Sequence, residues 1–112
     1  MEAKHTATPW KLRNDGQTYN GQTIEAECMG NGHYAGIAHA TQRDPHPTLG
    51  GGIDQVTAEA NASFIVRACN THDALVKALR QIARLSSEGE VSANMQYALG
   101  DIALAALSAA GA

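Results

Sequence analysis

The sequence predicts an α+β fold, in which an N-terminal antiparallel β-meander is followed by a two-helix antiparallel hairpin. Three observations predict it. All three prolines and most of the 11 glycines lie before residue 56, between short segments of alternating polarity. A long helical pattern follows, and a second helical pattern comes after a short polar loop. With 112 residues, the chain is expected to form a single domain over residues 1–112.

The sheet is predicted in the first third of the chain. Residues 1–7 are expected to be a loose tail, and residues 8–41 to form the meander, whose last strand covers residues 33–40. Asn20-Gly21 is a typical hairpin dipeptide, because both central residues of a type I′ turn need a positive φ. The sequence therefore predicts a tight turn before the central strand.

Alternation in the central strand predicts which of its faces is buried. Ile24, Ala26 and Cys28 share one face, which we expect to pack against the core. Glu25 and Glu27 lie on the other face and are expected to point into water.

Residues 42–56 are predicted to form a surface loop, since they contain two prolines and the run Gly50-Gly51-Gly52. A glycine-rich segment before a helix can cradle a phosphate group. This segment lacks the Lys-Ser/Thr pair of a P-loop, so we interpret it as a flexible connector.

The second half of the chain is predicted to be helical. Residues 57–85 form a long helix with Asp54 or Thr57 as its N-cap, and residues 91–110 form a second helix capped by Ser92. Their apolar stripes and the short connection predict an antiparallel pair. The first stripe holds Asn61, Ile65, Ala68, His72, Leu75, Leu79 and Ile82, and an adjoining row of Ala62, Val66, Cys69, Val76 and Ala83 widens it into an apolar face. The second stripe holds Met95, Leu99, Ile102 and Ala106, with Leu104 and Leu107 beside it.

The net charge of −3 conceals an uneven distribution. Residues 1–59 contain four basic and seven acidic side chains, and residues 60–85 contain four basic side chains and one acidic one. Residues 86–112 contain three acidic side chains and no basic one. The acidic total excludes a protein that coats DNA. The long helix, with a local charge of +3, is the segment suited to a small anion.

Composition also excludes several classes of protein. No run of the chain reaches the roughly 18 apolar residues of a membrane span, and the N-terminus lacks the apolar stretch of a signal peptide. We therefore expect a cytoplasmic location. Two cysteines are too few for a disulfide framework, and Cys28 and Cys69 are expected to be buried thiols.

Neither a metal, a cofactor nor a catalytic centre is expected. The five histidines do not show the spacing of metal ligands. Cys69 and His72, three residues apart, are the nearest approach to a catalytic pair, but both lie on the predicted buried face. A thiol in apolar surroundings is inert, so we do not expect an enzyme.

Two polar residues interrupt the apolar stripe of the long helix. Asn61 and His72 stand where the pattern favours leucine, and a buried polar group needs a hydrogen-bond partner. Three interpretations are open: they fasten the helix to the sheet backbone, they fix the register of a dimer seam, or they line a ligand pocket.

The third interpretation leads to a predicted nucleotide site. Arginine binds phosphate, asparagine can read a base edge, and an aromatic ring can stack on the base. The predicted ligand-binding set is Arg67, Asn61, Asn70, His72, Trp10 and Arg84.

Residues 5–12, with Thr8-Pro9-Trp10, and residues 59–79, with the Glu-Ala-Asn-Ala run that begins at Glu59, resemble a group of small phage and prophage proteins. In layout the chain is similar to the Thoeris anti-defence sponge proteins. These have an N-terminal sheet and two C-terminal helices, form dimers and hexamers, and sequester cyclic nucleotide signals without cleaving them. The resemblance implies a phage-encoded anti-defence protein.

The functional expectation combines these observations. We expect a homo-oligomer, because the alanine-rich second half offers only a thin core for one chain. The expected ligand is a small anionic nucleotide, which the protein binds and does not cleave. The alternative is an anti-CRISPR-type inhibitor that blocks a host defence effector through its acidic surface.

Overall fold

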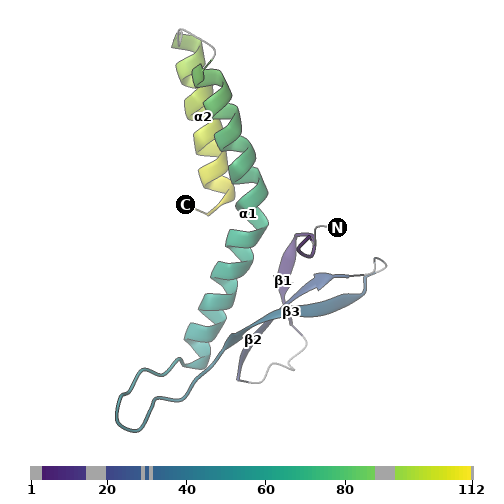
Figure 1. Cartoon of the computed structure of the whole chain (residues 1–112), viewed down its shortest axis with the longest axis vertical. Helices are drawn as coiled ribbons and strands as arrows, with labels where there is room; N and C mark the ends of the chain where they lie inside the picture. Colours follow the sequence, from purple (N-terminus) through teal and green to yellow (C-terminus); the bar gives the residue numbers. More distant parts are fainter. Residues whose placement is uncertain (1–3, 15–19, 29, 31, 88–92, 112) are drawn as a thin grey trace. The chain divides into compact units, whose positions relative to one another are not determined.

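The computed structural model describes residues 4–14, 20–28, 30, 32–87 and 93–111. A three-stranded sheet comes first and two helices follow, so the α+β fold is confirmed (Figure 1). The chain divides into two compact units, Met1–Asn70 and Thr71–Ala112. Helix α1 contributes its first half to one unit and its second half to the other.

The sheet is the expected antiparallel meander. Its strands are β1 (Trp10–Leu12), β2 (Gly21–Glu27) and β3 (Tyr34–Thr41), in the order β1-β2-β3. A β-bulge lies beside Ile24 and Glu25, so that β3 carries one extra residue, Ile37, at this point. Ile37 is half-buried and packs against the core.

The core of the first unit is small and closed by α1. Ile24 and Ala26 of β2 and Ala58 and Ala62 of α1 have no exposed surface. Ile24 is the large side chain at its centre, and alanines on the helix let the backbone come close to the sheet. The residues packed around this centre are Trp10, Leu12, Ile37, Ala40, Ile65 and Val66.

The role of Gly21 differs from the one that the dipeptide predicted. Asn20 does adopt a positive φ of 54°, but Gly21 begins β2 with a φ of 137°. A Cβ atom there would collide with the backbone of Ala40, so glycine is needed for a close approach of two strands. The residues just before Asn20, which would complete the predicted turn, lie outside the described residues.

Two side chains, one in β2 and one just after it, contradict the simple alternation. Glu25 is buried and binds two cations of the β1 edge, with Lys11 Nζ at 3.5 Å and Arg13 Nε at 3.2 Å from its carboxylate oxygens. The two nearby cations offset the cost of removing this carboxylate from water. Cys28 is exposed and not buried, because β2 ends at Glu27 and the chain turns away from the core.

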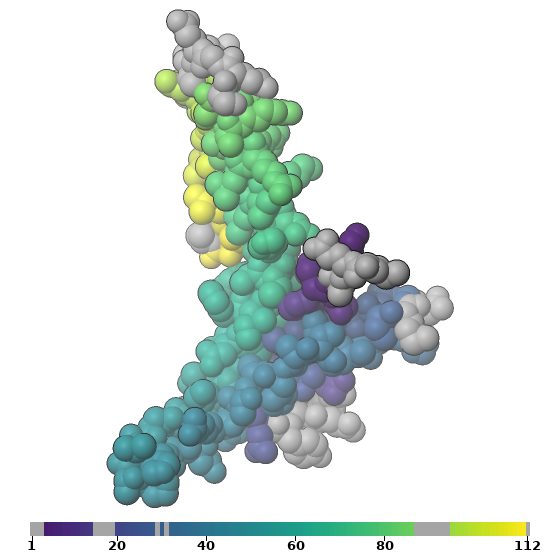
Figure 2. Space-filling view, viewed as in Figure 1, coloured from purple at the N-terminus to yellow at the C-terminus, as the bar shows by residue number. Residues whose placement is uncertain are grey.

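The loop before α1 has more internal structure than a flexible connector requires. Arg43 and Ile53 exchange two backbone hydrogen bonds, and His46 and Gly50 exchange two more. Gly52 lies so close to the Arg43 and Pro45 backbone that a Cβ atom would collide with it. The paired segment projects away from the sheet as a finger (Figures 1 and 2).

Helix α1 (Gln55–Ser87) begins two residues earlier and ends two residues later than predicted, and it is unbroken. Asp54 is its N-cap, since the Thr57 N–H donates to Asp54 Oδ1 at 2.7 Å. In the first unit its buried or half-buried positions are Gln55, Ala58, Ala62, Ile65, Val66, Cys69 and Asn70. The buried face follows the predicted adjoining row more closely than the predicted stripe, of which Asn61 and Ala68 are exposed.

The second unit is the expected helical hairpin of α1 and α2 (Ala93–Ala109). Half-buried residues of α1 follow a new series, Thr71, Leu75, Ala78, Ile82 and Leu85, and the predicted seam of α2, namely Met95, Leu99, Ile102 and Ala106, is half-buried as well. His72 and Leu79 of the predicted stripe are exposed. No described side chain of residues 71–86 and 95–111 is fully buried. Ser92, the predicted cap of the second helix, lies outside the described residues.

Candidate functional site

Four of the six predicted ligand-binding residues lie in the first unit, and two of these contact each other. The Asn70 amide bonds both polar groups of the Trp10 backbone: Trp10 N–H donates to Oδ1 at 2.7 Å, and Nδ2 donates to the Trp10 carbonyl at 2.9 Å. Asn70 thus acts on β1 as a further strand would. Asn70 therefore connects the helix to the sheet backbone, a role that the sequence analysis considered for Asn61 and His72.

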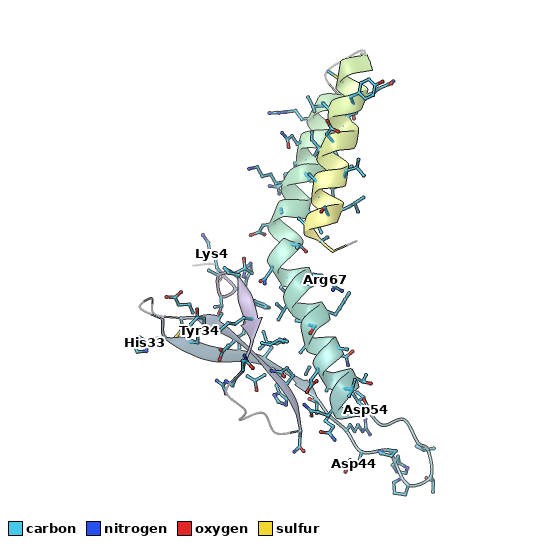
Figure 3. All side chains as sticks on the ribbon, turned by 180° about the vertical axis from the view of Figure 1, so that it is seen from behind. Lys4, His33, Tyr34, Asp44, Asp54 and Arg67 are labelled. Carbon is cyan, nitrogen blue, oxygen red and sulfur yellow. The ribbon has the colours of Figure 1, made fainter. Side chains whose placement is uncertain are left out.

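Asn61 and Arg67 do not join this pair. Asn61 is nine residues before Asn70, which places it about 180° around the helix from the sheet-facing amide. The Arg67 guanidinium lies 5.9 Å from the centre of the Phe64 ring, on the side of α1 that faces away from the sheet (Figure 3). The first unit therefore does not gather Trp10, Asn61 and Arg67 around one pocket.

His72 and Arg84 belong to the second unit and are also apart. They are twelve residues from each other on α1, which is about 18 Å along the helix axis. The His72 side chain is 68 % exposed, and its Nδ1 lies 3.1 Å from Oδ1 of the neighbouring Asp73. The expectation that His72 is buried is wrong, because the seam of the hairpin passes through Thr71 and Leu75.

Arg84 lines a basic hollow whose other residues were not among the predicted ligand-binding residues. Lys77, Arg80, Gln81 and Arg84 line a hollow of about 280 Å³ on α1. Their spacing of three, four and seven residues puts them on one face of the helix, since 3.6 residues make a turn. We call these four residues the basic hollow.

An apolar groove adjoins the basic hollow. It runs between α1 and α2, has a volume of about 310 Å³ and shares Lys77 and Gln81 with the hollow. The other residues that line it are Ala74, Ala78, Ile102, Ala105, Ala106 and Ala109. Small side chains leave this groove open, because alanine fills little of the space between two helices.

The combined surface suits an anion that carries an apolar part. Three cations on one helix face concentrate positive potential, and guanidinium groups bind phosphate oxygens in pairs. Alanine methyl groups provide a surface for a flat ring. Among the described residues, the side chains that line the basic hollow are three cations and one amide.

The sequence contained a signal for this face that the predicted set did not use. Lys77, Arg80 and Arg84 recur at helical spacing, and Gln81 follows Lys77 by one turn. The predicted site included Asn61 and His72 instead, because these polar residues interrupt the apolar stripe.

A second hollow lies at the far end of β2 in the first unit. It measures about 290 Å³ and is lined by Ala7, Thr8, Pro9, Glu27, Cys28, Gly30 and Tyr34. Lys11 Nζ lies 3.9 Å from the centre of the Tyr34 ring (Figure 3), and Cys28 Sγ donates to the His33 carbonyl at 3.6 Å. The thiol is exposed, and the described residues that line the hollow with it include the Glu27 carboxylate but no cation that would favour a thiolate.

Among the described residues, no three histidine, cysteine, aspartate or glutamate side chains come close enough to hold a metal ion. None of the described helices is both long and apolar enough to cross a membrane.

Comparison with protein-family models, with curated proteins and with solved structures finds no match for this chain. The geometry of its own residues is therefore the basis for a functional proposal.

Proposed function

We propose that this chain is a phage-encoded anti-defence protein that sequesters a cyclic nucleotide signal in the host cytoplasm, as a homo-oligomer and without cleaving the ligand. One observation carries the proposal: the basic hollow and the apolar groove share Lys77 and Gln81. A nucleotide needs both kinds of surface, since its phosphates are anionic and its bases are flat and largely apolar.

The site in this proposal is not the one that the sequence predicted. Of the predicted residues, it retains Arg84 and adds Lys77, Arg80 and Gln81. Trp10 and Asn70 are assigned a structural role, because their polar groups bind each other.

Calorimetric titration with a panel of cyclic mononucleotides and oligonucleotides tests the proposal. We expect one of them to bind, and the Arg80→Gln and Arg84→Gln variants to weaken that binding at least tenfold, which corresponds to about 1.4 kcal/mol. Arg67→Gln is the matched control, since it removes a cation from the same helix outside the hollow. Chromatography of the ligand after incubation should return it unchanged.

Two results of this titration would contradict the proposal. Absence of binding across the panel would exclude a nucleotide sponge. Binding that Arg67→Gln abolishes and Arg84→Gln leaves intact would move the site to the first half of α1.

A second candidate function is inhibition of a host defence effector by direct contact. It is favoured by apolar side chains that the first unit exposes: Leu49 at the tip of the finger is 84 % exposed, and Val56 and Phe64 project from α1. Phe64 is the strongest candidate contact among them, because aromatic side chains are enriched in the buried centre of protein interfaces. Co-purification of an effector from host lysate that Leu49→Ser and Phe64→Ser abolish, with no nucleotide bound, would favour this function over the first.

A further inference from the structure

We propose that the outer face of α2 is a dimer interface that packs antiparallel against the same face of a second copy of this chain. We call this face the outer seam and define it by Tyr97, Gly100, Leu104 and Leu107. The inference deepens one part of the proposed function, namely self-association. Its test is made without any nucleotide, so that either proposal can fail while the other stands.

Helix α2 has two apolar faces. From residue 93 to residue 111 its one charged side chain is Asp101, which lies on a narrow polar line with Asn94 and Ser108 at seven-residue spacing. One apolar face, with Met95, Leu99, Ile102 and Ala106, is half-buried in the hairpin. A hairpin of two helices covers only that face, so the second apolar face of α2 is left exposed.

The uncovered face has the spacing of a helix-packing seam. Tyr97, Leu104 and Leu107 are 75 %, 66 % and 49 % exposed. Steps of seven and three residues place them on one stripe, as in the a and d positions of a heptad. Leu104 and Leu107 are thus large apolar side chains on one stripe, and each keeps about half or more of its surface exposed.

Gly100 completes the stripe, three residues after Tyr97 and four before Leu104. Its backbone is ordinary helix, and a Cβ atom built on it would meet nothing within 4 Å. Glycine inside a helix costs about 0.5–1 kcal/mol relative to alanine. Nothing in its own chain requires a glycine here, whereas a second helix that approaches closely at this point would.

The stripe is complementary to itself in one orientation. When two α2 helices are antiparallel and centred on residue 102, Gly100 lies opposite Leu104 of the partner subunit, and Tyr97 lies opposite Leu107 of the partner subunit. Each Leu104 then fills the space that each Gly100 leaves. A two-fold symmetric contact of this kind uses one surface twice and closes on itself.

The exposed area approaches the lower limit for a specific dimer. Tyr97, Leu104 and Leu107 together expose on the order of 400 Å² per copy, as large as the largest apolar patch of a typical monomer. Complete burial in two copies covers on the order of 800 Å², and the neighbouring alanines add to this toward the roughly 1,000 Å² that a specific interface needs.

The mass of the full chain, measured by light scattering between about 5 and 200 μM, tests the proposal. We expect a dimer for the wild type and at least a tenfold weaker dimer for Leu104→Glu. Val56→Glu is the matched control, because Val56 is similarly exposed, at 73 %, but lies on the first unit. A monomeric wild type, or a dimer that Val56→Glu weakens and Leu104→Glu does not, would overturn the proposal.

Gly100→Leu separates a packing effect from a folding effect. Leucine is a better helix former than glycine, so the variant should keep or increase the helix signal in circular dichroism. In the dimer it collides with Leu104 of the partner subunit, and we expect the mass to fall to that of a monomer. A Gly100→Leu dimer as tight as the wild type would contradict the close approach.

Cross-linking tests the orientation. In a Cys28→Ser, Cys69→Ala background, we expect a Gly100→Cys protein mixed with a Leu104→Cys protein to form a disulfide-linked pair under mild oxidation. Each protein by itself should cross-link much less. Efficient self-linkage of Gly100→Cys would show parallel helices and would refute the antiparallel seam.

Discussion

The two compact units of this chain solve the problem of a small core in different ways. In Met1–Asn70, one sheet and one helix enclose side chains without any exposed surface, with Ile24 at the centre. In Thr71–Ala112, two helices leave every described side chain at least partly exposed. A sheet packed on a helix closes a core with little material, whereas two helices in contact leave their outer faces open.

The difference also explains where the polar groups are found. The first unit buries Glu25 and half-buries Asn70, and it satisfies both with partners on β1. The second unit keeps its cations and amides on the surface, where they can meet a ligand. The first unit is therefore the scaffold, and the second carries the surfaces that we propose to be functional.

The largest expected effect tests the contrast in burial directly. Ile24→Ala removes a fully buried side chain and should lower the free energy of unfolding by about 3–4 kcal/mol. Ile82→Ala makes the same chemical change at a half-buried position of the hairpin and should cost about 1–2 kcal/mol. Urea unfolding, followed by the fluorescence of the single tryptophan and by circular dichroism, measures both. Equal losses would contradict the contrast.

A second pair of variants tests the fastener on the same helix. Asn70→Ala leaves the Trp10 N–H and carbonyl without their partners and should cost about 2 kcal/mol. Asn61→Ala changes an exposed amide and should cost less than about 0.5 kcal/mol. The change in Trp10 fluorescence on unfolding gives the values. A larger loss for Asn61→Ala would mean that this amide, too, holds a structural contact.

The buried carboxylate is expected to have a smaller effect. Glu25→Gln keeps the shape of the side chain but removes its attraction to Lys11 and Arg13, both of which remain in partial contact with water. We expect a loss of about 1 kcal/mol, reduced by salt. Urea unfolding of variant and wild type at low and high salt measures it, and Glu27→Gln, at an exposed position of the same strand, is the control.

The smallest effect concerns the N-cap of α1, the element that both units share. Hydrogen bonds from the Thr57 hydroxyl and from its backbone N–H hold the pKa of Asp54 below the ordinary value of 3.8. A carboxyl with a lowered pKa stabilises the folded state above its unfolded pKa, and this contribution is lost as the pH falls through the folded pKa. Acid below pH 3.8 should therefore weaken the cap.

Asp54→Asn isolates this titration, because asparagine also caps helices but carries no charge. We expect the variant to lack this part of the acid sensitivity while it keeps its helix at neutral pH. The carboxyl titration of the wild type, followed by nuclear magnetic resonance, checks the direction. A midpoint above 3.8 for Asp54 would contradict it.

Much of the fold could be read from the sequence. The order of strands and helices, the Asp54 cap and the hairpin of two helices follow from turn residues, periodicity and a capping side chain, all of which are local signals. The candidate site was predicted less well. Of the six residues chosen, Arg84 lies in the basic hollow, whereas Asn70 proved to be a structural contact and Asn61 and His72 are exposed.

The sequence by itself determined which segments are helix and strand, because the spacing of apolar residues is a property of one segment. It did not determine which face of α1 is buried, since that depends on what packs against it. The sheet takes the series that contains Ala58 and Ala62, and α2 takes the series that contains Leu75 and Ile82, so the single stripe that the sequence suggested does not exist. Only the tertiary structure decided which face of α1 is buried in each unit. It also decided the burial of Glu25, the exposure of Cys28 and the hydrogen-bond partner of Asn70.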